Sequence, residues 1–233
     1  DRNNNSSSLV SRTASSSGQT ANAYSEASAL SADGRFALLF SYANDLVAGS
    51  DLNNNADVFL FDRVDNSNAL ISRATAGAST ANGDSIGKSL SSDGRYALYS
   101  SMGNNLISGV TDNNFARDVF LVDRQDNSKL LVSRAASAPT NSANGNSEPV
   151  ALSADGRYVL FVSNATNLVS GISDNNGDSD VFLFDRDTGV NTLISRSSSS
   201  AASAAGFSQA SALSPDGRYV LFYSNASDLV SGI

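Results

Sequence analysis

The chain has 233 residues, with 15 basic and 23 acidic side chains and a formal net charge of −8, which argues against binding nucleic acid through its phosphates. Histidine and cysteine are both absent, and this excludes serine–histidine and cysteine–histidine catalysis, disulfides and thiolate metal sites. No apolar run approaches the roughly 20 residues that a membrane helix needs, so we expect no insertion into a membrane.

Three short strings recur along the chain with a period of about 61 residues. The first is "LSADGRFALLFS" at Leu30, which returns at Leu90, Leu152 and Leu213. The second is "DVFLFDR" at Asp57, which returns at Asp118 and Asp180. The third is "ALISR" at Ala69, which has counterparts at Ser8, Leu130 and Thr192. An internal repeat of this kind sets the fold, so every other feature is interpreted within one period.

Each period is predicted to hold four short strands. In the third period these are "EPVALS" (148–153), "RYVLFVS" (157–163), "DVFLFDR" (180–186) and "NTLISR" (191–196). Asp155-Gly156 predicts a tight hairpin between the first two, and a longer connection joins the second to the third. The run "VFLF" is apolar at every position, so this strand should be buried on both faces. No stretch has a sustained helical period, and the Ser- and Ala-rich linkers between periods should be exposed.

Antiparallel four-stranded units with both faces buried, repeated at this period, predict an all-β fold of β-propeller type with about four blades, which could belong to a larger propeller. The "LSxDGRYVLF" and "DVFLFDR" motifs resemble the TolB-like, WD-repeat-like β-propeller family. That resemblance covers nearly the whole chain and implies the fold, but it implies no particular activity. A tandem array of small β-sandwich or solenoid modules is the alternative.

The phase of the repeat divides 1–233, as a single propeller domain or segment, into blades at about 13–73, 74–134 and 135–196. An incomplete blade is formed by 197–233 together with 1–12. A missing strand leaves an unpaired edge. We therefore expect a segment of a longer array, or completion of the blade by another chain, which would make the protein a homo-oligomer or filament former.

The loop before each "DVFL" strand carries Asp or Asn at alternate positions. Positions 1, 3, 5 and 7 are Asp51, Asn53, Asn55 and Asp57 in the first loop, Asp112, Asn114, Ala116 and Asp118 in the second, and Asp174, Asn176, Asp178 and Asp180 in the third. Alternating short oxygen ligands resemble the start of a calcium loop, and a set without His or Cys favours calcium over zinc or copper. These eleven Asp and Asn residues are the candidate Ca²⁺ ligands. The distal glutamate of an EF-hand is missing, and Asp and Asn are also the preferred residues of polar turns.

Twelve of the fifteen basic residues are arginines at three fixed repeat positions: Arg35, Arg95, Arg157 and Arg218; Arg2, Arg63, Arg124 and Arg186; Arg12, Arg73, Arg134 and Arg196. We expect each to pair with an Asp or a carbonyl of its own blade; an anion-binding ring is the alternative. The recurring aromatic residues Phe36, Tyr96, Tyr158 and Tyr219 are expected in the core or between blades, unless they line a sugar-binding face.

The sequence as a whole predicts a non-enzymatic, extracellular or cell-surface scaffold or interaction module, with structural calcium in its loops and a protein or carbohydrate as partner. The second hypothesis is a propeller that supports ligand binding or a hydrolase elsewhere in a larger protein. A residue that breaks the repeat inside a central channel would favour it. The third is a subunit of a filament or surface layer.

Overall fold

The computed structural model describes residues 2–49, 53–75 and 79–231. Within these residues every regular element is a β-strand. The first sheet contains β1 (Ser25–Leu30), β2 (Phe36–Ser41), β3 (Asp57–Asp62) and β4 (Ser67–Leu70), the second β5 (Ser85–Leu90), β6 (Tyr96–Ser101), β7 (Asp118–Asp123) and β8 (Ser128–Leu131), and the third β11 (Ser147–Leu152), β12 (Tyr158–Ser163), β13 (Asp180–Asp185) and β14 (Val190–Leu193).

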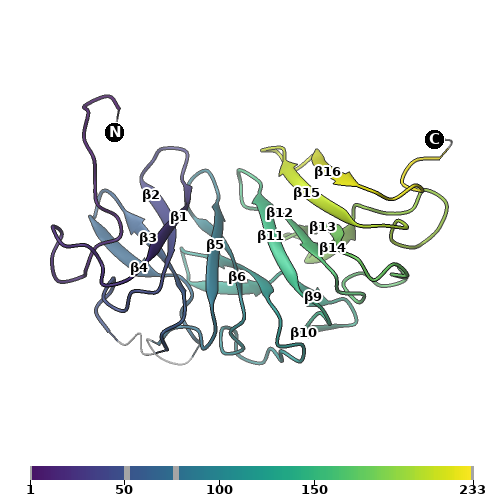
Figure 1. Ribbon diagram of the computed structural model, residues 1–233, viewed down its shortest axis with the longest axis horizontal. Helices are drawn as coiled ribbons and strands as arrows, with labels where there is room; N and C mark the ends of the chain where they lie inside the picture. The colour runs from purple at the N-terminus through teal and green to yellow at the C-terminus, as the bar shows by residue number, and fades with distance from the viewer. Residues whose placement is uncertain (1, 50–52, 76–78, 232–233) are drawn as a thin grey trace.

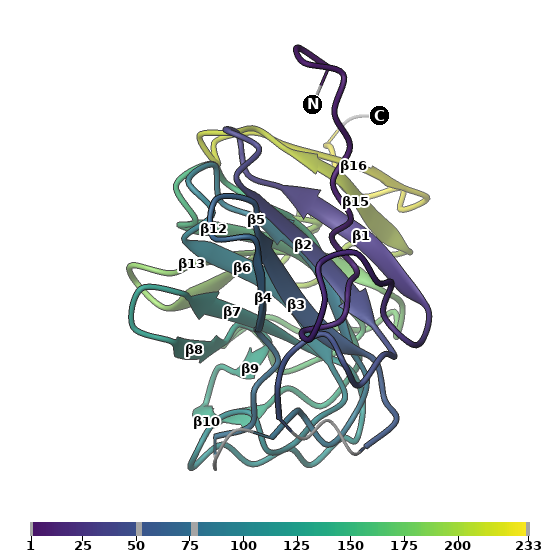
Figure 2. The same ribbon diagram turned by 90° about the vertical axis from the view of Figure 1, so that its left-hand side faces the viewer.

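Each of these sheets is an antiparallel meander in sequence order, and β15 (Ser208–Leu213) and β16 (Val220–Ser224) begin a fourth. The sheets follow one another around an open arc, with the two chain ends at opposite ends of it (Figure 1). Seen from the side, the sheets lie one behind another and overlap in the view (Figure 2). The predicted all-β propeller architecture is therefore confirmed, as an arc of blades that is not closed.

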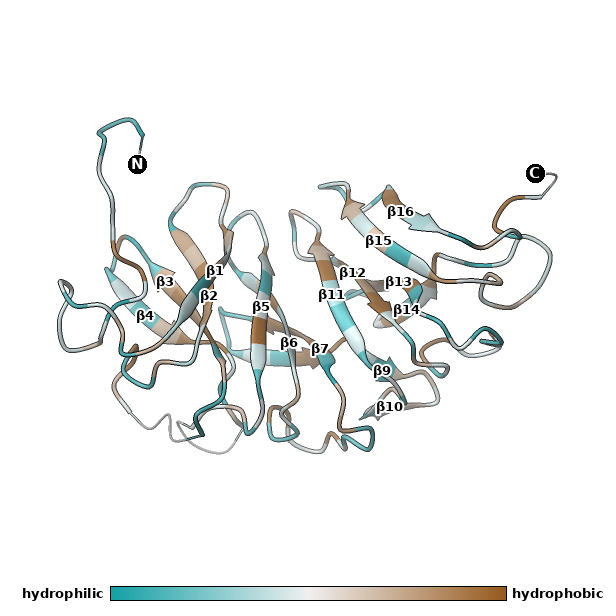
Figure 3. Cartoon of the chain, in the orientation of Figure 1, coloured by the Kyte–Doolittle hydropathy of each residue, from teal (hydrophilic) through white to brown (hydrophobic). Residues whose placement is uncertain are grey.

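The apolar core lies between adjacent blades. One cluster joins Leu38 and Leu60 of the first blade to Tyr99 and Phe120 of the second, and an equivalent cluster joins the second blade to the third. The middle strands are mostly buried, and β3 and β6 are buried at all six positions. Hydrophobic residues accordingly concentrate in these strands, while the loops are mostly hydrophilic (Figure 3). Burial of "VFLF" on both faces is thus confirmed in the first blade, and in the third blade for every position except the half-buried Leu183.

A bidentate ion pair closes each complete blade. The guanidinium of Arg35 donates to Asp62 from Nε at 3.0 Å and from Nη2 at 2.7 Å. The same pairing recurs between Arg95 and Asp123 and between Arg157 and Asp185. Hydrogen bonds from Arg35 lower the pKa of Asp62 to about 2. For these three arginines, pairing inside the blade is confirmed.

An aromatic ring joins each blade to the next. The guanidinium of Arg124, from the second blade, lies 4.1 Å from the ring centroid of Phe36 in the first, and Arg186 lies 4.2 Å from that of Tyr96. The hairpin glycine of the following blade closes over the same ring: a Cβ on Gly94 would lie 2.3 Å from the ring of Phe36. Phe36, Tyr96 and Tyr158 are therefore blade-interface residues, as predicted, whereas Tyr219 is exposed.

Backbone hydrogen bonds connect the hairpin turns in one direction only. Ala32 N–H donates to the carbonyl of Ser92, Ser92 N–H to that of Ala154, and Ala154 N–H to that of Pro215, at 2.8 to 2.9 Å. Each turn thus donates to the turn of the next blade.

The linkers between blades depart from the expectation that they are exposed. One of them forms a small ribbon of β9 (Arg134–Ala135) and β10 (Ala138–Ser142). Ala81, Ala143 and Ala204, at equivalent linker positions, are all buried. Their small side chains allow the backbone to fold back under the next loop, and this packing has no signal in a sequence dominated by Ser and Ala.

The hairpin glycines give a matched test of the blade contact. Gly34 and Gly156 both have a positive φ (+68° and +71°), but a Cβ on Gly34 meets no atom within 4 Å, whereas on Gly156 it would lie 2.2 Å from the ring of Tyr96. G34A should therefore cost only the left-handed backbone penalty, about 1 kcal/mol. G156A should cost about 1 to 3 kcal/mol more through overpacking. Chemical denaturation of the two variants tests this, and equal losses would contradict it.

Candidate functional site

The aspartate that opens each third strand is buried beneath the preceding loop. Asp118 accepts a hydrogen bond from Ser133 Oγ at 2.6 Å, and the same hydroxyl accepts the backbone N–H of Val119 at 3.0 Å. Ser72 and Ser195 make the equivalent bonds to Asp57 and Asp180. Ser72, Ser133 and Ser195, each from an "SR" dipeptide, thus join the end of the fourth strand to the start of the third.

The aspartate at loop position 1 organises the turn. Asp112 Oδ1 accepts the backbone N–H groups of Asn114 at 3.1 Å and Phe115 at 3.3 Å, and the hydroxyl of Ser142 at 3.1 Å. In the third loop Asp174 Oδ1 does the same with Asn176 and Gly177, and with the hydroxyl of Ser203 at 3.2 Å. These are the side-chain-to-backbone bonds by which Asp stabilises turns.

Positions 1 and 7 of the loop meet at a small cavity that is partly open to the surface. Asp112, Asp118 and Ser142 line a space of about 10 Å³, backed by apolar side chains that include Leu106 and Phe120. Asp174, Asp180 and Ser203 line an equivalent space in the third loop. A volume of this order is about one water-sized sphere. Two carboxylates and a hydroxyl therefore converge on a position large enough for a single small ion or molecule.

Burial strongly affects the two inner carboxyl groups. It raises the pKa of Asp118 to about 7 and that of Asp180 to about 6, and the neighbouring charges of Asp112 and Asp174 add to the rise. Both inner groups lose hydration and face a second carboxylate, and both effects disfavour the charged form. A bound cation would favour that form.

The asparagine at position 3 is directed away from this cavity. Asn114 Nδ2 donates to the carbonyls of Ala143 and Gly145 in the following linker, and its Oδ1 accepts the N–H of Ala116 at 2.7 Å. Asn176 makes the same contacts with Ala204, Gly206 and Asp178. Position 3 therefore fixes the loop to the linker and leaves the two aspartates as the inward-facing pair.

The first loop is described only in part. Asp51 lies outside the described residues, while Asn53 Nδ2 donates to Thr80 Oγ1 at 2.9 Å and to the carbonyl of Ala81. The backbone N–H of Asn55 donates to Asn53 Oδ1 at 2.8 Å. At the equivalent position 5 of the third loop, the side chain of Asp178 is exposed. Nowhere in the described ranges do three or more Asp or Glu side chains gather in a group that could hold a metal.

The linker hydroxyls are the site residues that sequence reasoning missed. Thr80, Ser142 and Ser203 precede the buried linker alanines at the same repeat position, in "TANG", "SANG" and "SAAG". This recurrence was the available signal. It is weak, because Ser and Ala fill every linker.

Replacement of Asp118 by Asn should change how stability depends on pH. In the wild type the folded pKa of about 7 exceeds the unfolded value, so the folded state binds more protons and stability falls as pH rises from about 4 to 7. D118N keeps an acceptor for Ser133 and has no titrating group. The variant should therefore gain about 1 to 3 kcal/mol relative to wild type between pH 4 and pH 8. Urea denaturation with a calcium chelator measures this, and parallel pH profiles would refute it.

Comparisons with known proteins give the fold context. No family model matches the chain, and no curated protein matches it. Among solved structures, a putative TolB from Agrobacterium tumefaciens aligns over 86% of this chain and 58% of its own, with 16% identity and a TM-score of 0.47. TolB from Acinetobacter baumannii aligns over 91% and 45%, with 16% identity and a TM-score of 0.42.

The β-propeller domain of the Trilobed protease from Pyrococcus furiosus aligns over 81% of this chain and 45% of its own, with 14% identity and a TM-score of 0.43. This chain therefore spans about half the length of the TolB structures it resembles. Likeness at this level concerns the fold alone. Separately, no helix among the described residues has the length and hydrophobicity needed to cross a bilayer.

Proposed function

We propose that the chain is a non-enzymatic interaction module of β-propeller type that acts outside the cell and holds structural calcium under its loops. The observation that carries this proposal is the convergence of Asp112 with Asp118, and of Asp174 with Asp180, on small cavities that are partly open to the surface. Buried carboxylates that face each other without a cation are costly, and a bound divalent ion would remove that cost.

The donor set fits calcium better than other metals. Each cavity offers two carboxylates and one hydroxyl, from Asp112, Asp118 and Ser142 or from Asp174, Asp180 and Ser203. Calcium takes six to eight oxygen ligands and accepts water among them. Two carboxylates imply a weak site, about 10⁻⁴ to 10⁻³ M. Such a site would fill at extracellular calcium levels, which supports a secreted or cell-surface location.

A scaffold role is supported by the way the recurring polar groups are used. The arginines of the hairpin turns pair with Asp62, Asp123 and Asp185, and the turn aspartates Asp33, Asp93 and Asp155 accept the backbone N–H two residues later. These groups obey the repeat in each of the three complete blades. A catalytic site needs groups that differ from one blade to another, so we assign the repeat to structure and the partner, a protein or a carbohydrate, to the surface.

One residue favours ligand binding as a second candidate function. Lys88 lies on β5, the first strand of the second blade. It is the extra residue of a β-bulge in the pairing of β5 with β6. The first strands of neighbouring blades pack against each other, and the positions equivalent to Lys88 are Ser28, Val150 and Ser211. Lys88 is exposed and breaks the repeat, as a residue that contacts a ligand would. Its bulge position is a common place for such side chains.

Strand completion would explain assembly, the third candidate. Within the described residues β16 pairs only with β15. Tyr219, Leu221 and Tyr223, on or beside β16, are each about 60% exposed. In the third blade, the equivalent Leu160 and Val162 are covered by the sheet that follows. A third strand would pair with the edge of β16, and a further blade, from more of the same polypeptide or from another copy, would cover the three side chains. Sedimentation at increasing protein concentration distinguishes these sources, because only the second makes the oligomer depend on concentration.

The calcium proposal predicts a melting temperature that rises with free calcium. Between chelated conditions and about 10 mM calcium, two weak sites should add about 3 to 10 °C, because the ion binds only the folded state. The double variant D118N/D180N should show no rise, whereas D178N, with its exposed side chain, should respond like wild type. A flat wild-type curve would make the loops polar turns and leave the propeller without a metal.

A further inference from the structure

Three equivalent grooves lie between the "SR" arginine of one fourth strand and the following blade. They are lined by Arg12, Arg73 and Arg134 together with the turn between the third and fourth strands of the next blade. Their volumes are about 250, 310 and 320 Å³. Since the repeat builds the same groove three times, differences among the three indicate where one has acquired its own role.

In the two flanking grooves the arginine is held in place. The guanidinium of Arg12 lies 4.9 Å from the ring centroid of Phe61 and donates to Asn66 Oδ1. That of Arg134 lies 5.5 Å from the ring centroid of Phe184 and donates to the carbonyl of Gly189. Both arginines therefore cross to the next blade, which corrects the expectation that they pair within their own. Both guanidinium groups are therefore already engaged in contacts within the fold.

The middle groove differs at two paired positions. Phe61 and Phe184 are replaced there by Val122, and the cross-strand partners Asn68 and Asn191 are replaced by Lys129. The loss of the ring removes the surface on which the other two arginines lie. Lys129 Nζ donates to the carbonyl of Arg73 at 2.5 Å, which places a second cation in the groove.

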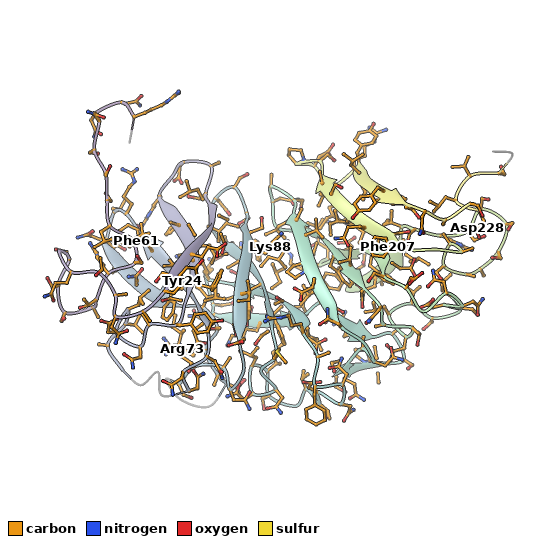
Figure 4. The ribbon with its side chains drawn as sticks, in the orientation of Figure 1. Tyr24, Phe61, Arg73, Lys88, Phe207 and Asp228 are labelled. Carbon is orange, nitrogen blue, oxygen red and sulfur yellow. The ribbon has the colours of Figure 1, made fainter. Side chains whose placement is uncertain are left out.

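These two cations have no acidic partner. Across the described ranges the guanidinium of Arg73 has no ion pair, hydrogen bond or aromatic contact, and the lining of the groove contains no Asp or Glu. Burial and the nearby charge of Arg73 lower the pKa of Lys129. Such a pair is unexpected in a protein of net charge −8. Arg73 is also exposed, at the lower side of the arc in Figure 4, so solutes can reach it.

We propose that this groove binds a small organic oxyanion, with the charged oxygens on Arg73 and Lys129 and an apolar body against the groove wall. Guanidinium and ammonium groups donate strongly to carboxylate and phosphate oxygens. The wall is formed by Leu70, Ile71, Leu106, Ile107 and Val122, and the volume is sufficient for a small molecule. The groove shares Leu106 and Ile107 with the cavity beside Asp112 and Asp118, but the charged groups of the two sites differ, so either site can exist without the other.

A purely structural explanation is the competing one. The stem of Lys129 could simply fill the space that a phenylalanine occupies in the other blades, and the head would then need no ligand. The two explanations differ in one respect: only a binding site is selective for the charge of a small molecule.

The experiment is a calorimetric titration of the whole chain at low ionic strength, about 20 mM, so that screening is weak. The probes are phenyl phosphate, benzoate and inorganic phosphate. Benzylamine, a cation that carries the same phenyl ring, is the control. We expect phenyl phosphate and benzoate to bind saturably, with dissociation constants of up to about 10 mM. Inorganic phosphate should bind more weakly, and benzylamine should not bind. The stronger of the two aromatic anions identifies the preferred head group.

Two variants locate the site. V122F/K129N converts the middle groove to the pattern of its neighbours and should weaken binding at least about tenfold. F184V/N191K builds the same pair beside Arg134 and should add a second site, and V122F/K129N decides alone if this variant does not fold. No binding of any anion by wild type, equal binding of benzylamine, or unchanged affinity in a folded V122F/K129N would each overturn the proposal.

Discussion

Besides the apolar core, one repeated contact joins the blades: at Phe36 and Tyr96, an aromatic ring lies between two guanidinium groups and beneath a glycine. Phe36 lies 4.8 Å from Arg35 of its own blade and 4.1 Å from Arg124 of the next. Gly94 approaches so closely that no other residue could occupy its place without displacing the ring. The ion pair with Asp62 holds Arg35 in position. The ring, the ion pair and the hairpin therefore act together at the place where the next blade docks.

The same constraint explains how much of the fold the sequence could predict. The ring, the glycine, the arginine and the aspartate each belong to a motif that recurs with the repeat, so strands, hairpins and the blade interface were predictable from spacing. The cavity under each loop was predictable only in part. Positions 1 and 7 do face each other, but Asn114 and Asn176 fasten the linker, because an amide can satisfy two backbone carbonyls that an aspartate could not.

What could not be predicted are the contacts made by residues without a distinctive pattern. Ser142 and Ser203 were hidden among many other serines, and the buried linker alanines gave no hydrophobic signal. Arg12 and Arg134 cross to the next blade because a phenylalanine on its third strand presents the face of its ring to the guanidinium. Only the middle groove, where Val122 replaces that ring, shows how strongly this contact depends on a single side chain.

The row of hydrogen bonds between hairpin turns gives the arc a direction. Ala32, Ser92 and Ala154 each have an N–H to donate forward, whereas Pro215 has a carbonyl that accepts and no N–H that could donate. The four repeats are therefore not interchangeable, although their sequences are nearly so. If the last repeat were transplanted to an interior place, the row would be interrupted at its proline. Exchange of the first three repeats among themselves would keep the row intact, whereas an interior place for the last repeat would remove one of its hydrogen bonds, because Pro215 has no N–H to donate.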